Sequence, residues 1–380
     1  RVLFIEIKGK TSRDPMEKLE TLRLNIWNAN IWLPGNVTWE DMKSKPGRPM
    51  PEFQDLLYAF PFSISFLLFR IIFDMLIMEP LARAEVQSVS TVGPCQQSKV
   101  GMGKEYMALS SDLFTHLLVP QGNGSLNAGR KWIEREKGSL RSVKEQLEIR
   151  KIRETGYRSV AHSIVFLFGV WTMADKPWLR NTDLCFWNPP HPVPWDIWWY
   201  YMLELGFHIT QTLMLPFDVK NSDFLAQLTH HVVTIGLMMG SWTAGTIRIG
   251  SIVLLVHDCA DVILQCGKLL KFFKGPDPDA TVFKVFLAFT ATWILTRVIY
   301  FPLYVNIPAT KAILHFDYFY FASVSLVVLL WSLFLLHLYW TYLLLRVIYG
   351  MVFRKKKLHD NRSEDEDSDE DDEIGKNKSK

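Results

Sequence analysis

Long apolar runs constrain this chain more than any other feature of its sequence. A helix needs about 20 mostly apolar residues to cross a bilayer. Lipid offers no partner for a free backbone N–H or C=O group, so each spanning segment must be a helix. The sequence therefore predicts an all-α, polytopic membrane protein with about seven transmembrane helices. The predicted spans are 56–78, 159–175, 196–217, 223–242, 247–270, 281–305 and 318–350.

Composition supports a membrane protein. Hydrophobic residues make up 49% of the chain and aromatic residues 13%, including 14 Trp. Trp and Tyr gather at membrane interfaces because their rings are amphipathic. The four cysteines are too few and too scattered for a disulfide framework. A soluble enzyme, a disordered chain and a secreted disulfide scaffold are therefore not expected.

Basic residues predict how the helices are oriented. Ten Lys and Arg residues lie in 130–158, and the cluster Arg354–Lys357 follows the last span. The positive-inside rule assigns both to the cytosol, so seven spans leave the N-terminus in the lumen. Asn36, in an Asn-Val-Thr sequence, is a glycosylation acceptor on that luminal side. The loop at 175–195 would also be luminal, and its prolines argue against helix there.

Polar residues inside the apolar runs fall on single helical faces. An ionisable group near mid-membrane costs roughly 2.5–3.5 kcal/mol on insertion scales. In 223–242, four polar residues recur at intervals of four, three and four, which is one face of a helix. We predict that such faces meet around a polar cavity. The stripes are Asp223, Gln227, His230 and Thr234; Glu204, His208 and Gln211; Arg248, Ser251, Asp258, Asp261, Gln265 and Lys268, flanked by His257; and Thr290, Trp293 and Arg297.

Two interpretations of these stripes compete. A polar residue in a span often only links helices, at about 0.6 kcal/mol on average, and this explains Glu204, Gln211 or Thr234 as well as a function does. Ser or Asn can make such contacts between helices, so the contacts need no ionisable group. Two adjacent histidines on one helix and two acids on the next therefore favour chemistry.

Imidazole can act as a nucleophile, a base or a metal ligand, and a nearby carboxylate can fix its tautomer. The histidines within reach, His208, His230, His231 and His257, lack the HxxxH and HxxHH spacing of membrane di-iron enzymes. No metal site is predicted. The option that remains is an imidazole acting on an activated acyl donor such as a thioester, with His230 and Asp261 in direct contact or bridged by one water.

These residues resemble the Lag1 motif of the ceramide synthases, within the wider TLC family. The motif pairs a His-His step with an HDxxD step, here His230-His231 and His257 to Asp261. The resemblance covers about residues 26–373. The matching segments are Trp32–Trp39, Pro177–Thr182, Tyr200–Leu205, Phe224–His231, Arg248–Gly250, Leu255–Asp261 with Lys268, and Asp360–Glu366.

The resemblance implies an endoplasmic-reticulum enzyme that N-acylates sphinganine or sphingosine with a fatty acyl-CoA. No cofactor is implied, because acyl-CoA is a substrate. His230 and His231 would be essential, with a covalent acyl-imidazole on His230, and Asp258 and Asp261 would orient histidine and help to deprotonate the amine. Arg248 and Lys268 would hold CoA phosphate or balance the acids. His257, Asp223 and Arg297 complete the predicted substrate-binding residues.

The expected partners are acyl-CoA, a sphingoid base and membrane lipids, with a homo- or hetero-dimer as an open expectation. Many family members carry a homeobox-like region after the first span, and residues 95–145 contain only fragments of it. Nucleic acid is not expected, because Glu134 and Glu136 weaken the character of a DNA-recognition helix there. The expected division is a luminal segment (1–55), a first transmembrane helix (56–78), a cytosolic basic region with that homeobox-like remnant (79–158), a TLC/Lag1 catalytic membrane domain (159–350) and a cytosolic acidic tail (351–380).

Three further points complete the sequence-based hypothesis. Gly245 stands where the family often has Asn, so the role of that amide is missing or supplied elsewhere. The segment from Val305 to Asp317 should be a loop, whose family equivalent affects acyl-chain length. Nine acids in 363–373 surround Ser363 and Ser368, which we predict to be phosphorylated. The alternatives are a non-catalytic TLC-family lipid transporter or scaffold, and a metal-dependent membrane lipid hydroxylase.

Overall fold

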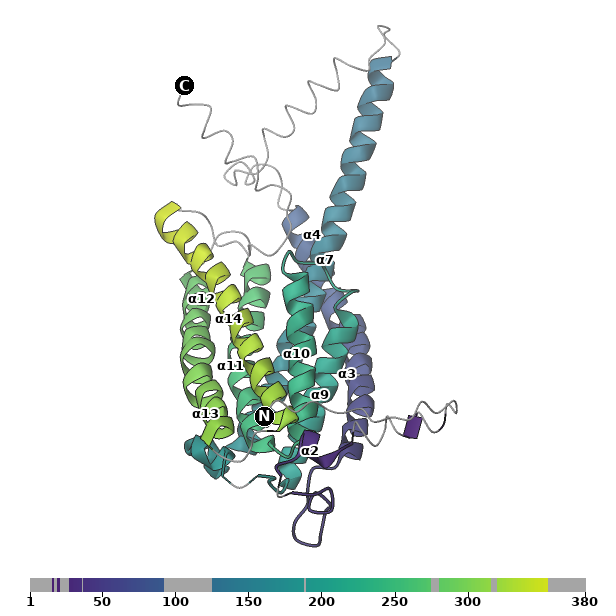
Figure 1. The fold of residues 1–380 in the computed structure, drawn as a ribbon. Helices are drawn as coiled ribbons and strands as arrows, with labels where there is room; N and C mark the ends of the chain where they lie inside the picture. Colours follow the sequence, from purple (N-terminus) through teal and green to yellow (C-terminus); the bar gives the residue numbers. More distant parts are fainter. Residues whose placement is uncertain are drawn as a thin grey trace. The chain divides into compact units, whose positions relative to one another are not determined.

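The computed structural model is helical and contains no β-strand among the residues that it describes (Figure 1). Several predicted sites lie outside these residues: Asn36, Ser363, Ser368 and most of the homeobox-like remnant. The described residues are 16, 19–20, 27–35, 37–91, 125–187, 189–274, 280–315 and 320–354.

The chain forms two compact units. The first comprises 1–67, 162–264 and 283–380, and the second 68–161 and 265–282. The helices are α2 (Ala29–Trp32), η1 (Phe53–Tyr58), α3 (Ala59–Phe73), η2 (Asp74–Met78), α4 (Glu79–Thr91), α7 (Ser125–Met173), α8 (Pro177–Arg180), η3 (Thr182–Cys185), α9 (Trp195–Met214), α10 (Phe224–Thr243), α11 (Ile247–Lys274), α12 (Ala280–Trp293), η4 (Ile294–Tyr300), η5 (Pro302–Asn306), α13 (Ile307–His315) and α14 (Phe321–Arg354).

Within the described residues, three helical segments are long and apolar enough to cross a membrane: Phe53–Gln87, Thr281–Leu314 and Phe321–Met351. Their mean hydropathies are 2.0, 1.7 and 2.2. The all-α prediction is confirmed for the described residues, whereas the number of seven spans stays a prediction. Helices α9, α10 and α11 coincide with predicted spans, but their polar stripes make them less apolar.

Two loop predictions were wrong. The helix that begins with α12 continues through two π-helical stretches, η4 and η5, into α13, and it ends at His315. Much of the predicted loop from Val305 is therefore helical. A π turn changes the hydrogen-bond ladder locally, so Pro302 is accommodated without ending the helix. In the predicted luminal loop, Pro177 opens α8 from its first position, where a missing N–H costs nothing.

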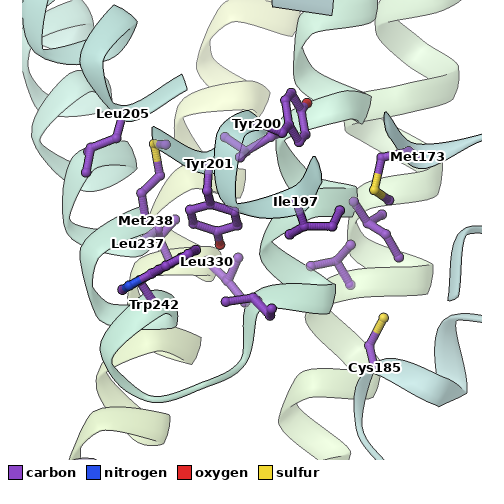
Figure 2. Packing of buried hydrophobic residues seen from close by; sticks show 14 of the residues in the cluster. Met173, Cys185, Ile197, Tyr200, Tyr201, Leu205, Leu237, Met238, Trp242 and Leu330 are labelled. Atoms are coloured by element: carbon purple, nitrogen blue, oxygen red, sulfur yellow. The ribbon is translucent and has the colours of Figure 1, made fainter. Parts of the chain in front are cut away.

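Helix α9 lies at the centre of the first unit. Its residues Ile197, Tyr200, Tyr201 and Met202 are fully buried in a large hydrophobic cluster (Figure 2). Gly206 lets α9 approach α3 closely, because a Cβ there would lie 2.5 Å from Phe62 Cβ. Small residues permit such close packing in membrane helices.

Helices α10 and α11 form an antiparallel pair joined by a three-residue turn. Gly245 in this turn has a φ of +67°, a conformation that glycine adopts without a steric penalty. A Cβ at Gly245 would lie 2.5 Å from Pro190 Cβ. The His191 N–H donates to the Gly245 carbonyl oxygen at 3.2 Å. The departure from the family's Asn therefore has a steric reason, since Pro190 occupies the space that a side chain would need.

The second unit has its own small core. Met78, Ala82, Val86 and Ile152 are buried together. Arg153 of α7 lies 3.6 Å from Asp74 Oδ2 and 3.3 Å from Glu79 Oε2. Helix α7 is continuous over its 49 residues, so the predicted basic region and the second predicted span share one helix.

Candidate active site

The first unit encloses a cavity of about 110 Å³ between α7, α9, α10, α11 and α14. We divide its lining into three parts. The polar end comprises His162, His208, Gln211, His230, His231, His257, Asp258 and Asp261. The apolar limb comprises Leu237, Met238, Ile249, Val253, Leu254, Leu326, Leu330 and Leu333. The end wall comprises Tyr201, Ser241 and Gly250, and Phe207, Thr234 and Thr246 complete the lining.

Helix pairing explains why polar and apolar residues separate along the cavity. Ser241 follows His230 by eleven residues on α10, and Asp261 follows Gly250 by eleven residues on α11. Each interval is about 16 Å of helix. Because the two helices are antiparallel, His230 and Asp261 lie at one end of the pair, and Ser241 and Gly250 at the other.

His230 is placed by α14 as well as by its own helix. Its ring packs edge-on against Trp340 at 5.4 Å between centroids. Trp340 Nε1 donates to Asp223 Oδ2 at 2.9 Å, which holds the indole in place. The Nδ1 atom of His230 is buried and has no hydrogen-bond partner among the described residues. No protein group in the described part of the chain therefore occupies this ring nitrogen.

His231 is held by a different partner. Its Nδ1 lies 3.1 Å from Thr212 Oγ1. The Thr212 hydroxyl gives its single hydrogen to the His208 carbonyl oxygen at 2.7 Å. Nδ1 of His231 must therefore be the donor to Thr212. In the neutral ring this arrangement leaves Nε2 without a proton.

Asp261 pairs with Arg297. The guanidinium Nη2 donates to Asp261 Oδ2 at 2.7 Å and to the His257 carbonyl oxygen at 2.7 Å. The Arg297 guanidinium also lies over the Trp293 ring, 4.3 Å from its centroid. The predicted direct contact between His230 and Asp261 is not formed, although both line the same cavity. A guanidinium is a stronger partner for a carboxylate than a neutral imidazole is.

His257 also lines the polar end and contacts a further histidine, His337, that does not line the cavity. The Nδ1 atom of His257 lies 2.6 Å from the Val253 carbonyl oxygen, so this nitrogen carries a proton. Its Nε2 lies 3.2 Å from Nε2 of His337, a fully buried residue of α14. In the neutral pair, His337 is the donor.

Two further acids lie near the polar end of the cavity. Asp258 is 4% exposed and lines the cavity, while Glu204 is fully buried behind it. Both carboxyl oxygens of Glu204, and Oδ2 of Asp258, are buried with no hydrogen-bond partner among the described residues. His208 Nδ1 lies 3.6 Å from Glu204 Oε2. The stripes predicted on α9, α10 and α11 therefore meet, as the helical spacing indicated.

Four predicted substrate-binding residues do not line the cavity. Asp223 holds Trp340, and Arg297 holds Asp261. Arg248 donates to the Leu184 carbonyl oxygen at 2.9 Å, and its guanidinium lies over Trp178, 5.1 Å from the ring centroid. Lys268 belongs to the second unit.

Sequence reasoning missed His162, Thr212, His337 and Trp340. A single histidine within the long apolar run at 318–350 was a usable signal, because such a residue is costly in lipid. Thr212 and Trp340 gave no such signal. In the described part of the chain, no group of three or more His, Cys, Asp or Glu is arranged to hold a metal.

The 176–194 loop contains two buried titratable groups. Burial lowers the pKa of His191 to about 4, although its ring bonds the Trp187 carbonyl oxygen at 2.9 Å. Burial likewise raises the pKa of the Cys185 thiol to about 12. Both groups are therefore neutral at pH 7, and the thiol is packed rather than reactive.

Comparison with known proteins agrees with the motif in this cavity. The TLC domain family model matches residues 151–346. The chain is 32% identical to human ceramide synthase 4 over 361 residues, which cover 92% of this chain and 88% of that protein. It is 32% identical to Caenorhabditis elegans ceramide synthase hyl-1 over 336 residues, covering 85% and 80%. For mouse ceramide synthase 4 the identity is 30% over 354 residues, covering 91% and 87%.

The family match spans more than half of the chain, and the similarity to the three relatives extends over most of both lengths. The resemblance drawn from the Lag1 residues is confirmed. This chain belongs to the TLC-domain family and, within it, to the ceramide synthases.

Proposed function

We propose that this protein makes ceramide by transferring a fatty acyl group from acyl-CoA to the amine of a sphingoid base. The observation that carries the proposal is the position of His230. This motif histidine lines the polar end of a cavity whose remainder is apolar. Such a cavity suits a substrate that has one reactive polar centre and one long hydrocarbon chain.

In the first step, a ring nitrogen of His230 attacks the thioester carbonyl carbon. The C–S bond breaks, and the CoA thiolate leaves and takes a proton. The acyl group is then an acyl-imidazole. A nucleophilic histidine needs a ring nitrogen free of protein partners, and Nδ1 of His230 meets that condition within the described residues.

In the second step, the substrate amine attacks the acyl-imidazole carbonyl carbon. An amide forms, the C–N bond to His230 breaks, and the proton that the amine gives up returns to the departing imidazole ring through a nearby acceptor. Asp258 and Asp261 line the cavity and are the candidate acceptors. Arg297 acts as a positioning residue for Asp261, while Thr212 fixes the tautomer of His231.

Arg248 and Lys268, the two basic residues of the motif on α11, differ in their surroundings. Arg248 is engaged with the 176–194 loop, so it holds the fold rather than CoA. Lys268 follows Asp261 by seven residues on the same helix, which is about 10 Å of helix. Lys268 belongs to the second unit, and its expected contact with CoA phosphate stays a prediction. The proposal also assigns the protein to the endoplasmic-reticulum membrane, with seven spans, a luminal N-terminus and a cytosolic C-terminus.

Product formation tests the activity. Purified protein with acyl-CoA and sphinganine should yield dihydroceramide, and His230→Ala should yield none. Gln227→Ala is the matched control, because Gln227 lies one turn away on α10 and does not line the cavity. Product from His230→Ala at the wild-type rate would defeat the mechanism. An absence of product from the wild type would defeat the activity.

Intact-mass spectrometry tests the intermediate separately. The wild type incubated with acyl-CoA alone should gain the mass of one acyl group and lose it when sphinganine is added. His230→Ala should gain none. An active wild type that never carries the added mass would indicate direct transfer from CoA to the amine.

A further inference from the structure

Tyr201, Ser241 and Gly250 line the cavity at the end that lies far from His230. Tyr201 of α9 is fully buried, and its hydroxyl lies 2.7 Å from Ser241 Oγ of α10. Ser241 gives its own hydrogen to the Met238 carbonyl oxygen at 3.1 Å, so Tyr201 is the donor. This hydrogen bond fixes the phenol ring across the limb.

Gly250 of α11 makes room for that hydroxyl. A Cβ at Gly250 would lie 1.8 Å from Tyr201 Oη and 3.2 Å from Ser241 Oγ. The Lag1 segment Arg248–Gly250 therefore contains a glycine because the tyrosine hydroxyl occupies the position of a side chain. Three helices contribute one residue each to this end wall.

A second aromatic residue supports the wall from behind. Trp242 is fully buried, and its ring packs against Tyr201 at 5.2 Å between centroids. Trp242 Nε1 donates to the Glu52 carbonyl oxygen at 2.9 Å. The phenol ring is thus held by the hydrogen bond of its hydroxyl and by the Trp242 ring, which has its own hydrogen bond. Displacing the phenol ring would break these contacts, so an acyl chain entering the limb would have to disrupt them.

We propose that the end wall of Tyr201, Ser241 and Gly250 sets the longest acyl chain that this enzyme transfers. The inference rests on the proposed function, in which the acyl carbonyl is bound at His230 and the chain extends into the apolar limb. About 16 Å of helix separates His230 from Ser241 on α10. This fixed distance limits how far an acyl chain bound at His230 can extend before it meets the end wall.

Neighbouring tyrosines on α9 provide a matched test. Tyr200 and Tyr201 are both fully buried, but only Tyr201 lines the cavity. Figure 2 shows the two rings pointing in different directions, with Tyr201 among Leu237, Met238, Trp242 and Leu330. Tyr201→Leu removes the barrier, and Tyr200→Leu makes the same truncation away from it.

The assay offers sphinganine and an equimolar mixture of saturated acyl-CoAs, and mass spectrometry reads the acyl lengths of the products. Tyr201→Leu should shift the main product to longer chains, while Tyr200→Leu should keep the wild-type distribution. An unchanged distribution in active Tyr201→Leu, or the same shift in both variants, would overturn the proposal.

A substitution in the opposite direction covers the case in which Tyr201→Leu does not fold. Leu330→Phe narrows the apolar limb from α14 and should shift the products to shorter chains. Leu335→Phe, on the same helix but 65% exposed, is its control. Wild-type lengths from active Leu330→Phe would overturn the proposal. A wild type that makes no ceramide at all would instead refute the proposed function, and with it the proposed limit on acyl-chain length.

Discussion

The ion pair between Asp261 and Arg297 allows a quantitative test of how the site is held together. The Arg297 side chain is 3% exposed and that of Asp261 is 25% exposed, with 2.7 Å between Nη2 and Oδ2. Breaking a buried pair by removing one partner costs about 3–5 kcal/mol, because the other charge is left uncompensated. The partial exposure of Asp261 places Arg297→Gln near the lower limit, at about 3 kcal/mol.

The second single variant and the double variant isolate the pair itself. Asp261→Asn should also destabilise, because it leaves the guanidinium without its carboxylate. The double variant should be more stable than the sum of the single losses by about 1–3 kcal/mol, the usual coupling for residues in contact. The assay is thermal unfolding of purified protein in one detergent, under fixed conditions. Additive losses within about 0.5 kcal/mol would refute the pairing.

Three further perturbations test other parts of the structure. Thr212→Val removes the partner of His231 Nδ1 and should lower kcat about fivefold with KM little changed, since a lost hydrogen bond costs about 1 kcal/mol. An unchanged kcat would contradict the tautomer assignment. Burial holds the pKa of His191 at about 4, so between pH 6.5 and 4 the unfolded chain binds a proton that the folded loop excludes. The free energy of unfolding should therefore decrease, by up to about 3 kcal/mol, as the pH is lowered through this range; thermal unfolding at each pH measures it. A His191→Gln variant whose stability depends on pH in the same way would contradict this cause. Gly245→Ala should lower thermal stability by about 1–2 kcal/mol from backbone strain alone, more with the Pro190 contact, and an unaffected midpoint would refute the steric account of that turn.

Helical periodicity predicted the part of the site that lies along neighbouring helices. His230, Asp258 and Asp261 line the cavity as predicted, because residues three or four apart share one helical face. His231 also lines the cavity, although it lies outside the predicted stripe. The same reasoning could not find the partner of Asp261. Arg297 comes from a distant helix with π-helical turns, and nothing in the local pattern says which acid it meets.

Contacts between residues distant in sequence explain the remaining errors. Arg248 shares a stripe with Asp258, yet it bonds the 176–194 loop, because its position near the start of α11 lies beside that loop. His337 and Trp340 shape the surroundings of His257 and His230 from α14, an apolar run in which the single histidine was the only usable signal. Periodicity specifies which face of a helix is polar, but tertiary packing decides which faces meet.

The short turn between α10 and α11 fixes where His230 on one helix lies relative to Asp258 on the other. Only residues 244–246 separate the two helices. Adding a single residue at the start of α11 would rotate every later side chain by about 100° about the helix axis. The α11 carboxylates, and His257 with them, would then leave the cavity while His230 and His231 on α10 stayed, so an insertion far from either group would separate the nucleophile from the acids.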